Sequence, residues 1–214
     1  MTTTLKIDFV SDVSCPWCAI GLSSLQQAID SLGDEVKVDL HFQPFELNPQ
    51  MVPEGEDTTE HLRKKYGASD EQAAATRETI RSRGADVGFT FNFDKRSRIY
   101  NTFDAHRLLH AAEITGHQLA LKKALLGAYF TEGKDPSNHA VLLEVATSVG
   151  MDADDVRAIL ESDRYASDVR EQENFYTSQG IHSVPAVVIN DRHLISGGQP
   201  AEVFERALRE IAAQ

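Results

Sequence analysis

Residues 5–32 read LKIDFVSDVSCPWCAIGLSSLQQAIDSL, which predicts a β-strand, a pair of cysteines and an α-helix in direct succession. Apolar and polar residues alternate over 5–10, as expected of a strand with one buried face. Apolar residues recur at helical spacing after the cysteines, and Gly33 is a typical helix stop. The two cysteines, Cys15 and Cys18, therefore fall at the start of a helix that follows a strand.

The chain of 214 residues is acidic, with 21 lysines and arginines against 33 aspartates and glutamates and a net charge of −12. Nucleic acids and anionic membrane surfaces bind clustered positive charge, so neither is an expected partner. No apolar run approaches the roughly 18 residues of a membrane span. The segment Met1–Lys6 lacks the basic region and apolar stretch of a secretory signal. We therefore expect a cytoplasmic protein.

The cysteine pair is expected to do redox chemistry. A thiolate of Cys15 at a helix N-terminus is stabilised by the helix dipole, and Pro16 fits an early helical position. We therefore expect an exposed, stabilised thiolate at Cys15, and Cys18, one turn further on, can attack a mixed disulfide. Two alternatives remain open, a zinc site and a chemically idle pair. Zinc needs two further ligands, for which only His106 and His110 are available.

The rest of the chain completes a mixed sheet around a helical block. A strand at 36–42 follows the first helix, and residues 58–180 are almost wholly helical by pattern. Two short strands joined by an Asn190-Asp191 turn and a closing helix after Pro200 come last. The order β-α-β, helices, α-β-β-α predicts an α/β fold with a helical insertion. We expect a discontinuous domain of residues 1–57 and 164–214, with 58–163 inserted.

The motifs that carry a family resemblance are DVSCPWCAIG at 12–21, NTFDAHR at 101–107, GIHSVP at 180–185 and SGGQP at 196–200. Together, and in this order, they resemble the DsbA-like branch of the thioredoxin superfamily and, within it, the FrnE-like group. The resemblance covers essentially the whole chain. It implies a thioredoxin fold with a helical insertion and an enzyme that exchanges or isomerises disulfides.

The resemblance also implies roles at the site. Cys15 is the nucleophile, Cys18 resolves the mixed disulfide, and the Val184–Pro185 bond is cis, although a proline before a strand can also simply start an edge strand. A cis bond leaves the Val184 backbone free to pair with an extended substrate. We expect substrate to lie along Pro16, Trp17, Val184 and Pro185.

The sequence departs from secreted members of the branch, because the dipeptide between the cysteines is Pro16-Trp17 and not Pro-His. Trp17 adds no donor or positive charge near the thiolate, and Asp12 opposes it if close. We therefore expect net reduction or isomerisation in a reducing cytosol. No metal is expected, and no cofactor beyond the Cys15–Cys18 disulfide, with glutathione as a candidate co-substrate. The substrate is a disulfide-containing protein or a small-molecule thiol.

Four other positions have both a functional and a structural interpretation. Asp8 could accept a proton from Cys18, although thioredoxins carry their buried carboxylate where this chain has Phe9. His106 could line the groove or be an ordinary hydrogen-bonded helix residue. Asn101 could do the same or cap the helix of residues 101–112. The aromatic residues of the 89–93 segment could wall a substrate site, but core packing is favoured.

Two rival functions remain. Glutathione-dependent transferases and 2-hydroxychromene-2-carboxylate isomerases look similar in fold, but they typically use serine at the position of Cys15 and lack a partner like Cys18. A non-catalytic module that binds through the groove at Pro185 is the second rival.

Overall fold

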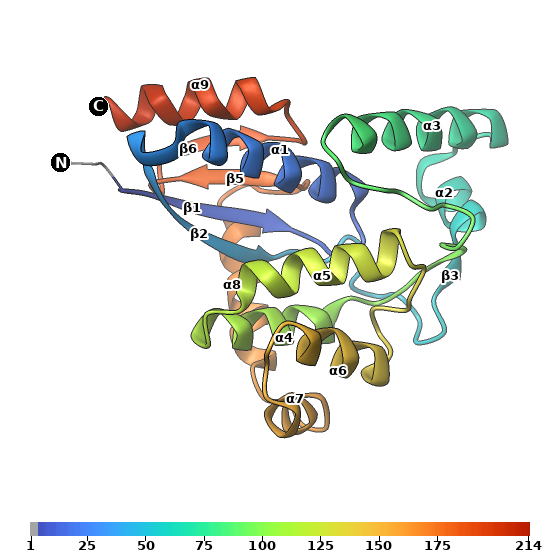
Figure 1. The fold of residues 1–214 in the computed structure, drawn as a ribbon. Helices are drawn as coiled ribbons and strands as arrows, with labels where there is room; N and C mark the ends of the chain where they lie inside the picture. The colour runs from blue at the N-terminus through green and yellow to red at the C-terminus, as the bar shows by residue number, and fades with distance from the viewer. Residues whose placement is uncertain (1–3) are drawn as a thin grey trace.

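A computed structural model describes residues 4–214 (Figure 1). Residues 1–3, part of the segment judged to lack a secretory signal, lie outside the described residues. A four-stranded sheet has the order β2-β1-β5-β6. The central strand β1 (Thr4–Ser11) runs parallel to β2 (Lys37–Pro44) and antiparallel to β5 (Ala186–Ile189), which pairs with β6 (His193–Ser196). The expected mixed sheet, built from both ends of the chain, is confirmed.

Two helices, α1 (Pro16–Leu32) and α9 (Ala201–Ala212), cover one face of the sheet (Figure 1). The alternation along β1 explains this, because every second residue from Leu5 to Phe9 enters the same core as these helices. From α9, Phe204 and Leu208 are fully buried there. Burial of these apolar side chains fixes α1, and with it the cysteines at its start.

The remaining helices form the block between β2 and β5. They are α2 (Thr58–Tyr66), α3 (Asp70–Asp86), α4 (Phe103–Ile114), α5 (Gln118–Phe130), α6 (His139–Ser148), α7 (Ala153–Leu160) and α8 (Ala166–Ser178). Helices α4 to α7 share a second apolar core. Helix α8 packs on the other face of the sheet, where Tyr176 meets Val10 and Ala186. In the residues described, no helix is long and apolar enough to cross a membrane.

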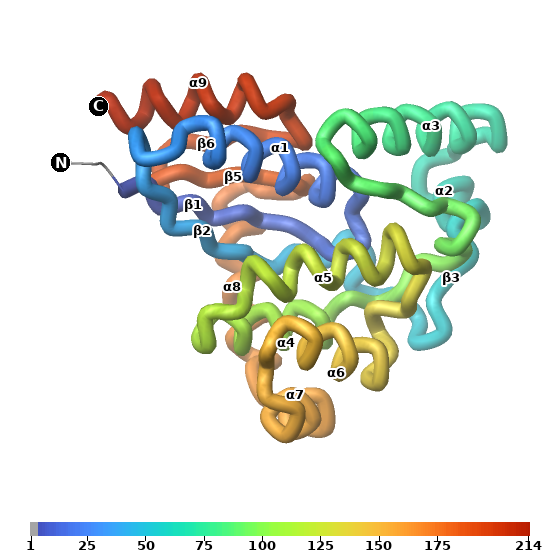
Figure 2. The backbone as a smooth tube through the Cα atoms, in the orientation of Figure 1, coloured from blue at the N-terminus to red at the C-terminus, as the bar shows by residue number. Residues whose placement is uncertain are grey.

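Figure 2 shows the path of the chain, with α1 and α9 above the sheet, α2 and α3 at the right and α4 to α7 below the sheet. The proposed division into residues 1–57 with 164–214 and an inserted 58–163 stays a prediction. The two parts do share a core, because Leu126, Tyr129 and Phe130 of α5 belong to the same cluster as Cys15 and Cys18. The insertion therefore forms part of the surroundings of the cysteines.

One short strand pairing is not visible in the sequence pattern. Strands β3 (Glu56–Asp57) and β4 (Arg98–Ile99) pair over two residues each, which is too short for alternation to show. The 89–93 segment is an extended loop, as expected, and Phe91 is buried against Phe130 with ring centroids 5.2 Å apart. Core packing of these aromatics is confirmed.

Leu208→Ala should lower the free energy of unfolding by about 2–5 kcal/mol, because it opens a cavity under α9. Leu194→Ala is the matched control, since Leu194 is 56% exposed on β6 and its loss should cost less than about 0.5 kcal/mol. Urea unfolding followed by circular dichroism measures both. Similar losses in the two variants would show that α9 does not depend on this contact.

Candidate active site

Cys15 and Cys18 lie at the N-terminus of α1, as predicted, and both are free thiols. Cys15 is the residue that caps the helix, with extended backbone angles (φ −92°, ψ 114°), and Pro16 begins the helix. The Cys18 amide donates to the Cys15 carbonyl at 3.1 Å, which closes the first turn. No side chain caps this helix end, so its free amide groups and partial positive charge face the Cys15 side.

Both thiols are buried. Cys18 is 0% exposed, and burial, followed by the hydrogen bond and charge of Cys15, raises the pKa of the Cys18 thiol well above its usual range. Cys15 is only 4% exposed, so the expected exposed nucleophile is wrong in that detail. The reason is the Val184 segment that lies over it, since the Cys15 Sγ is 3.6 Å from the Val184 carbonyl oxygen. Helix position alone could not predict this cover.

The Val184–Pro185 peptide bond is cis, as expected. The Pro185 carbonyl accepts from the Gly197 amide at 2.8 Å, which ties the proline loop to the Gly197-Gly198 segment. Two glycines allow the close approach of this unit to α1. A Cβ on Gly21 would lie 3.1 Å from the Pro185 ring, and one on Gly198 would lie 2.9 Å from the Trp17 carbonyl oxygen. The loop over Cys15 therefore depends on missing side chains at two positions.

The Asp12 carboxylate is buried just before the cysteines. It accepts from the Ser14 hydroxyl at 3.0 Å and from the Leu47 amide at 2.7 Å, and His106 Nε2 lies 3.4 Å away. Burial alone favours the neutral acid, but His106, the Leu47 amide and Thr102 together lower the pKa of Asp12 to about 2. Asp12 is thus ionised, and its contacts hold the turn before Cys15 in place. Its predicted opposition to a Cys15 thiolate stays a prediction.

The two residues expected from the 101–107 motif lie behind Asp12. His106 on α4 is 2% exposed and faces Asp12, which favours the interpretation as a structural helix residue over a groove-lining one. The Asn101 Oδ1 accepts from the Phe103 amide at 2.9 Å at the start of α4, and its Nδ2 lies 3.5 Å from Glu46. The N-cap residue of α4 is Thr102, so Asn101 does not cap the helix itself but orders the turn that leads into it.

Asp8 is not placed to serve Cys18. Its Oδ1 accepts from the Gln43 side chain at 2.7 Å, Lys6 lies 3.0 Å from its other oxygen, and it also interacts with Tyr176 of α8. These contacts belong to the face of the sheet away from α1, because successive strand residues point to opposite faces. Asp8 is one residue away from Phe9, which occupies the position of the thioredoxin carboxylate, and it therefore points to the opposite face of the sheet.

Two buried polar groups near the site were not expected. Lys122 on α5 is 1% exposed, and Glu46 in the loop after β2 is 8% exposed and in an ion pair with Arg170. A signal for Lys122 did exist, because it stands on the apolar face of a predicted helix with Leu125, Leu126 and Tyr129. In residues 4–214, no three His, Cys, Asp or Glu side chains are arranged to hold a metal ion, and His106 and His110 bring no third ligand to the cysteines.

A known family accounts for this fold and this arrangement. A DSBA-like thioredoxin domain matches residues 6–209. The chain belongs to the DsbA-like thioredoxin family. The predicted fold class, a thioredoxin fold with a helical insertion, is thereby confirmed, whereas membership of the FrnE-like group stays a prediction. Members of the DsbA-like family are disulfide oxidoreductases or isomerases, which supports the same broad class of enzyme here.

Three solved structures of this DsbA-like fold are informative. SCO1869 from Streptomyces coelicolor, described as a probable DsbA oxidoreductase, is 32% identical with a TM-score of 0.92, over 98% of this chain and 91% of that one. The cytosolic disulfide reductase DsbM of Pseudomonas aeruginosa, solved with GSH, is 17% identical with a TM-score of 0.67, over 98% and 100%. A 2-hydroxychromene-2-carboxylate isomerase is 14% identical with a TM-score of 0.72, over 98% and 97%. The last two share the fold alone.

Asp12→Asn should remove a pH dependence of stability. Because the pKa of Asp12 is about 2 when folded and ordinarily 3.8, ionised Asp12 stabilises the fold above pH 3.8, and this is lost as pH falls through 2. The loss is roughly 2 kcal/mol. Urea unfolding should therefore show that the difference in free energy of unfolding between wild type and Asp12→Asn shrinks from pH 5 through pH 3 to pH 2. Asp154→Asn, at a 94% exposed carboxylate, is the control, and its difference from wild type should stay constant.

Gly198→Ala should reduce disulfide turnover about tenfold or more, because its Cβ meets the Trp17 carbonyl and pushes the proline loop away from Cys15. Gly127→Ala is the matched control. Gly127 lies inside α5 with no atom within 4 Å of an added Cβ, so this variant should gain about 0.5–1 kcal/mol of stability and keep its turnover. Equal turnover of Gly198→Ala and wild type with insulin would refute the close-approach argument.

Proposed function

We propose that this protein is a cytoplasmic dithiol–disulfide oxidoreductase that works as a reductase or isomerase. The observation that carries the proposal is the pair of free thiols at the uncapped start of α1, with Cys18 beneath Cys15 and the Val184 carbonyl above it. The likeness to SCO1869, over nearly the whole of both chains, supports disulfide chemistry.

The reaction has two exchange steps. The Cys15 thiolate attacks one sulfur of the substrate disulfide, forms a mixed disulfide and releases the other substrate sulfur as a thiolate. Cys18 then loses its proton and attacks the Cys15 sulfur, so that the Cys15–Cys18 disulfide forms and the second substrate thiolate leaves. In isomerisation, a substrate thiolate attacks the mixed disulfide before Cys18 does. The high pKa of Cys18 makes its deprotonation the demanding part of the second step.

The direction of electron flow is proposed from the residue between the cysteines. Trp17 adds no positive charge beside Cys15, and its side chain packs partly into the core. Without a positive charge on the residue beside it, the Cys15 thiolate is less favoured, so the dithiol is a less oxidising couple and suits a reducing compartment. The cytosolic reductase DsbM shares the fold and was solved with GSH, which supports glutathione as the co-substrate that restores the dithiol. The substrate is then a disulfide-bonded protein or a small-molecule disulfide.

The alternative is a glutathione-dependent transferase or isomerase of the same fold. The likeness to a 2-hydroxychromene-2-carboxylate isomerase keeps it open at the level of fold. The buried Cys18 thiol beside Cys15 favours disulfide exchange, because a transferase needs one activated sulfur and no resolving partner. Insulin reduction that stops in Cys15→Ser supports the oxidoreductase. Glutathione conjugation that survives in Cys18→Ser supports the alternative, and no turnover of either kind supports a binding module.

Cys18→Ser should accumulate mixed disulfides through Cys15, because the resolving attack is removed. Cys15→Ser should trap nothing, since Cys18 is fully buried and cannot reach a substrate sulfur. Non-reducing gels and intact-protein mass after incubation with oxidised glutathione or insulin measure both. Equal trapping by the two variants would contradict the assigned roles.

A further inference from the structure

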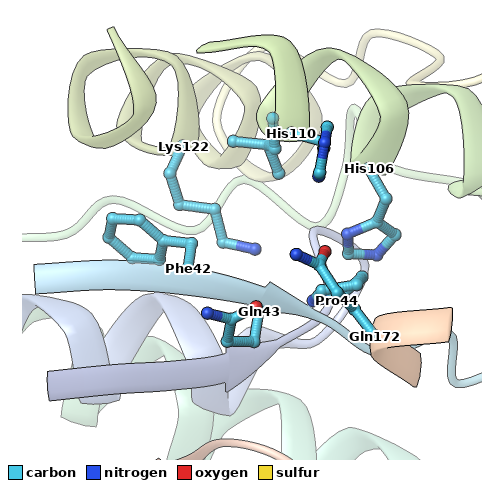
Figure 3. Close-up of a pocket in the computed structure, with 8 residues that line it drawn as sticks. Phe42, Gln43, Pro44, His106, His110, Lys122 and Gln172 are labelled. Atoms are coloured by element: carbon cyan, nitrogen blue, oxygen red, sulfur yellow. The ribbon is translucent and has the colours of Figure 1, made fainter. Parts of the chain in front are cut away.

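Lys122 is a buried basic group with no role in the exchange steps described above. It projects from α5 toward β2 (Figure 3), and among residues 4–214 its side-chain nitrogen has no hydrogen-bond partner. The aromatic ring of Phe42 is 5.9 Å from this nitrogen. Burial of an unpaired ammonium costs several kcal/mol, so these surroundings favour the neutral amine. A buried amine without a partner is in position for chemistry more than for stability.

Lys122 shares a small internal cavity with two histidines of α4. The cavity has a volume of about 10 Å³, the size of one water molecule, and lies between α4, α5 and β2. His106 and His110 line it. His110 Nδ1, like the Lys122 nitrogen, lacks a hydrogen-bond partner within the described part of the chain, whereas His106 Nε2 faces Asp12 at 3.4 Å. The Lys122 amine and the His110 imidazole at one cavity form a pair of groups that can take up and pass on a proton.

The amine of Lys122 and the thiol of Cys18 are electrostatically matched. Helix α5 packs against α1, and among the charges that act on Lys122 the Cys18 thiolate attracts it most, ahead of Asp12 and Cys15. Burial lowers the pKa of Lys122 and raises that of Cys18. The same dry surroundings therefore make the amine a ready acceptor and the thiol a reluctant donor, and transfer between them creates an attracting pair of charges.

The other titratable groups that face this pair are less suitable acceptors. Asp12, with a pKa of about 2, is a weak base at neutral pH. His106 already directs its Nε2 toward Asp12, and Cys15 is bonded to substrate when Cys18 reacts. His110 lines the cavity and also lines an open cleft of about 450 Å³ beside α8.

We propose that Lys122 is the proton acceptor for Cys18 during resolution of the mixed disulfide, and that His110 connects it to solvent. The inference rests on the proposed function. The S–H bond of Cys18 breaks and an N–H bond forms on the neutral amine. The Cys18 sulfur bonds to the Cys15 sulfur, and the Cys15–substrate bond breaks with its electron pair leaving on the substrate thiolate. The ammonium then returns its proton through the cavity, so no further oxidant or base is consumed.

Reaction of the reduced protein with 5,5′-dithiobis(2-nitrobenzoate) separates the two steps, because attack by Cys15 releases one coloured thiolate and resolution by Cys18 releases the second. In Lys122→Met we expect the first phase to match wild type and the second to be at least about tenfold slower at pH 7. The second-phase rate of the variant should rise about tenfold per pH unit, following direct ionisation of Cys18, whereas that of wild type levels off.

Lys123→Met is the matched control, because Lys123 is the exposed neighbour on α5 and donates to Gln26 at 2.6 Å. Both of its phases should equal those of wild type. Methionine fills the space of the Lys122 chain and removes a buried, unpaired polar group, so thermal stability should not fall. If Lys122→Met does not fold, Lys122→Gln takes its place in the same assay.

An unchanged second phase, or equal slowing of both phases with the wild-type pH profile, would overturn the role of Lys122. A second phase that is slowed in His106→Gln but normal in Lys122→Met would also overturn it, by giving the role to His106. Failure of the proposed function looks different, because wild type would then show no first phase that depends on Cys15.

Discussion

The buried Asp12 carboxylate is the interaction on which the geometry of the site depends. It joins the turn that carries Cys15 to the loop after β2 through the Leu47 amide, and to α4 through His106. Because it is ionised and shielded from water, each of its hydrogen bonds is charge-assisted, and loss of any one leaves a buried charge less compensated. The sheet and the helical insertion are therefore held in register at the point where α1 begins.

The loop that contains the cis Val184–Pro185 bond forms the other part of the site. Gly21 and Gly198 let it approach α1 until the Val184 carbonyl reaches the Cys15 sulfur. Cys15 thus sits between the N-terminal end of α1 and a peptide carbonyl. Because Cys18 is wholly buried, its surroundings favour the uncharged thiol over the thiolate.

Much of this arrangement follows from sequence. Alternation and helical spacing predict the strands of the sheet and the helices, and the order of four short motifs predicts the cis Val184–Pro185 bond. The cover over Cys15 could not be predicted, because it depends on a contact between residues 169 positions apart in the sequence. Asp8 differs from the thioredoxin carboxylate by one position, which places it on the opposite face of the sheet. The burial of Lys122 was not predicted, because a lysine on an apolar helix face is normally expected to extend its long side chain to water.

Helix α3 has a consequence for the motions of the molecule. Of its 17 residues only Ala73, Ile80 and Gly84 are buried, although Arg83 reaches the Gly198 carbonyl at 3.5 Å beside the proline loop. A helix that buries so little apolar surface opens at a lower free energy than the sheet or α1. In amide hydrogen exchange, α3 should lose its protection before the sheet and α1. The helix next to the dithiol can thus unfold locally at low cost, and such opening widens the approach for a bulky protein substrate while the strands beneath stay closed.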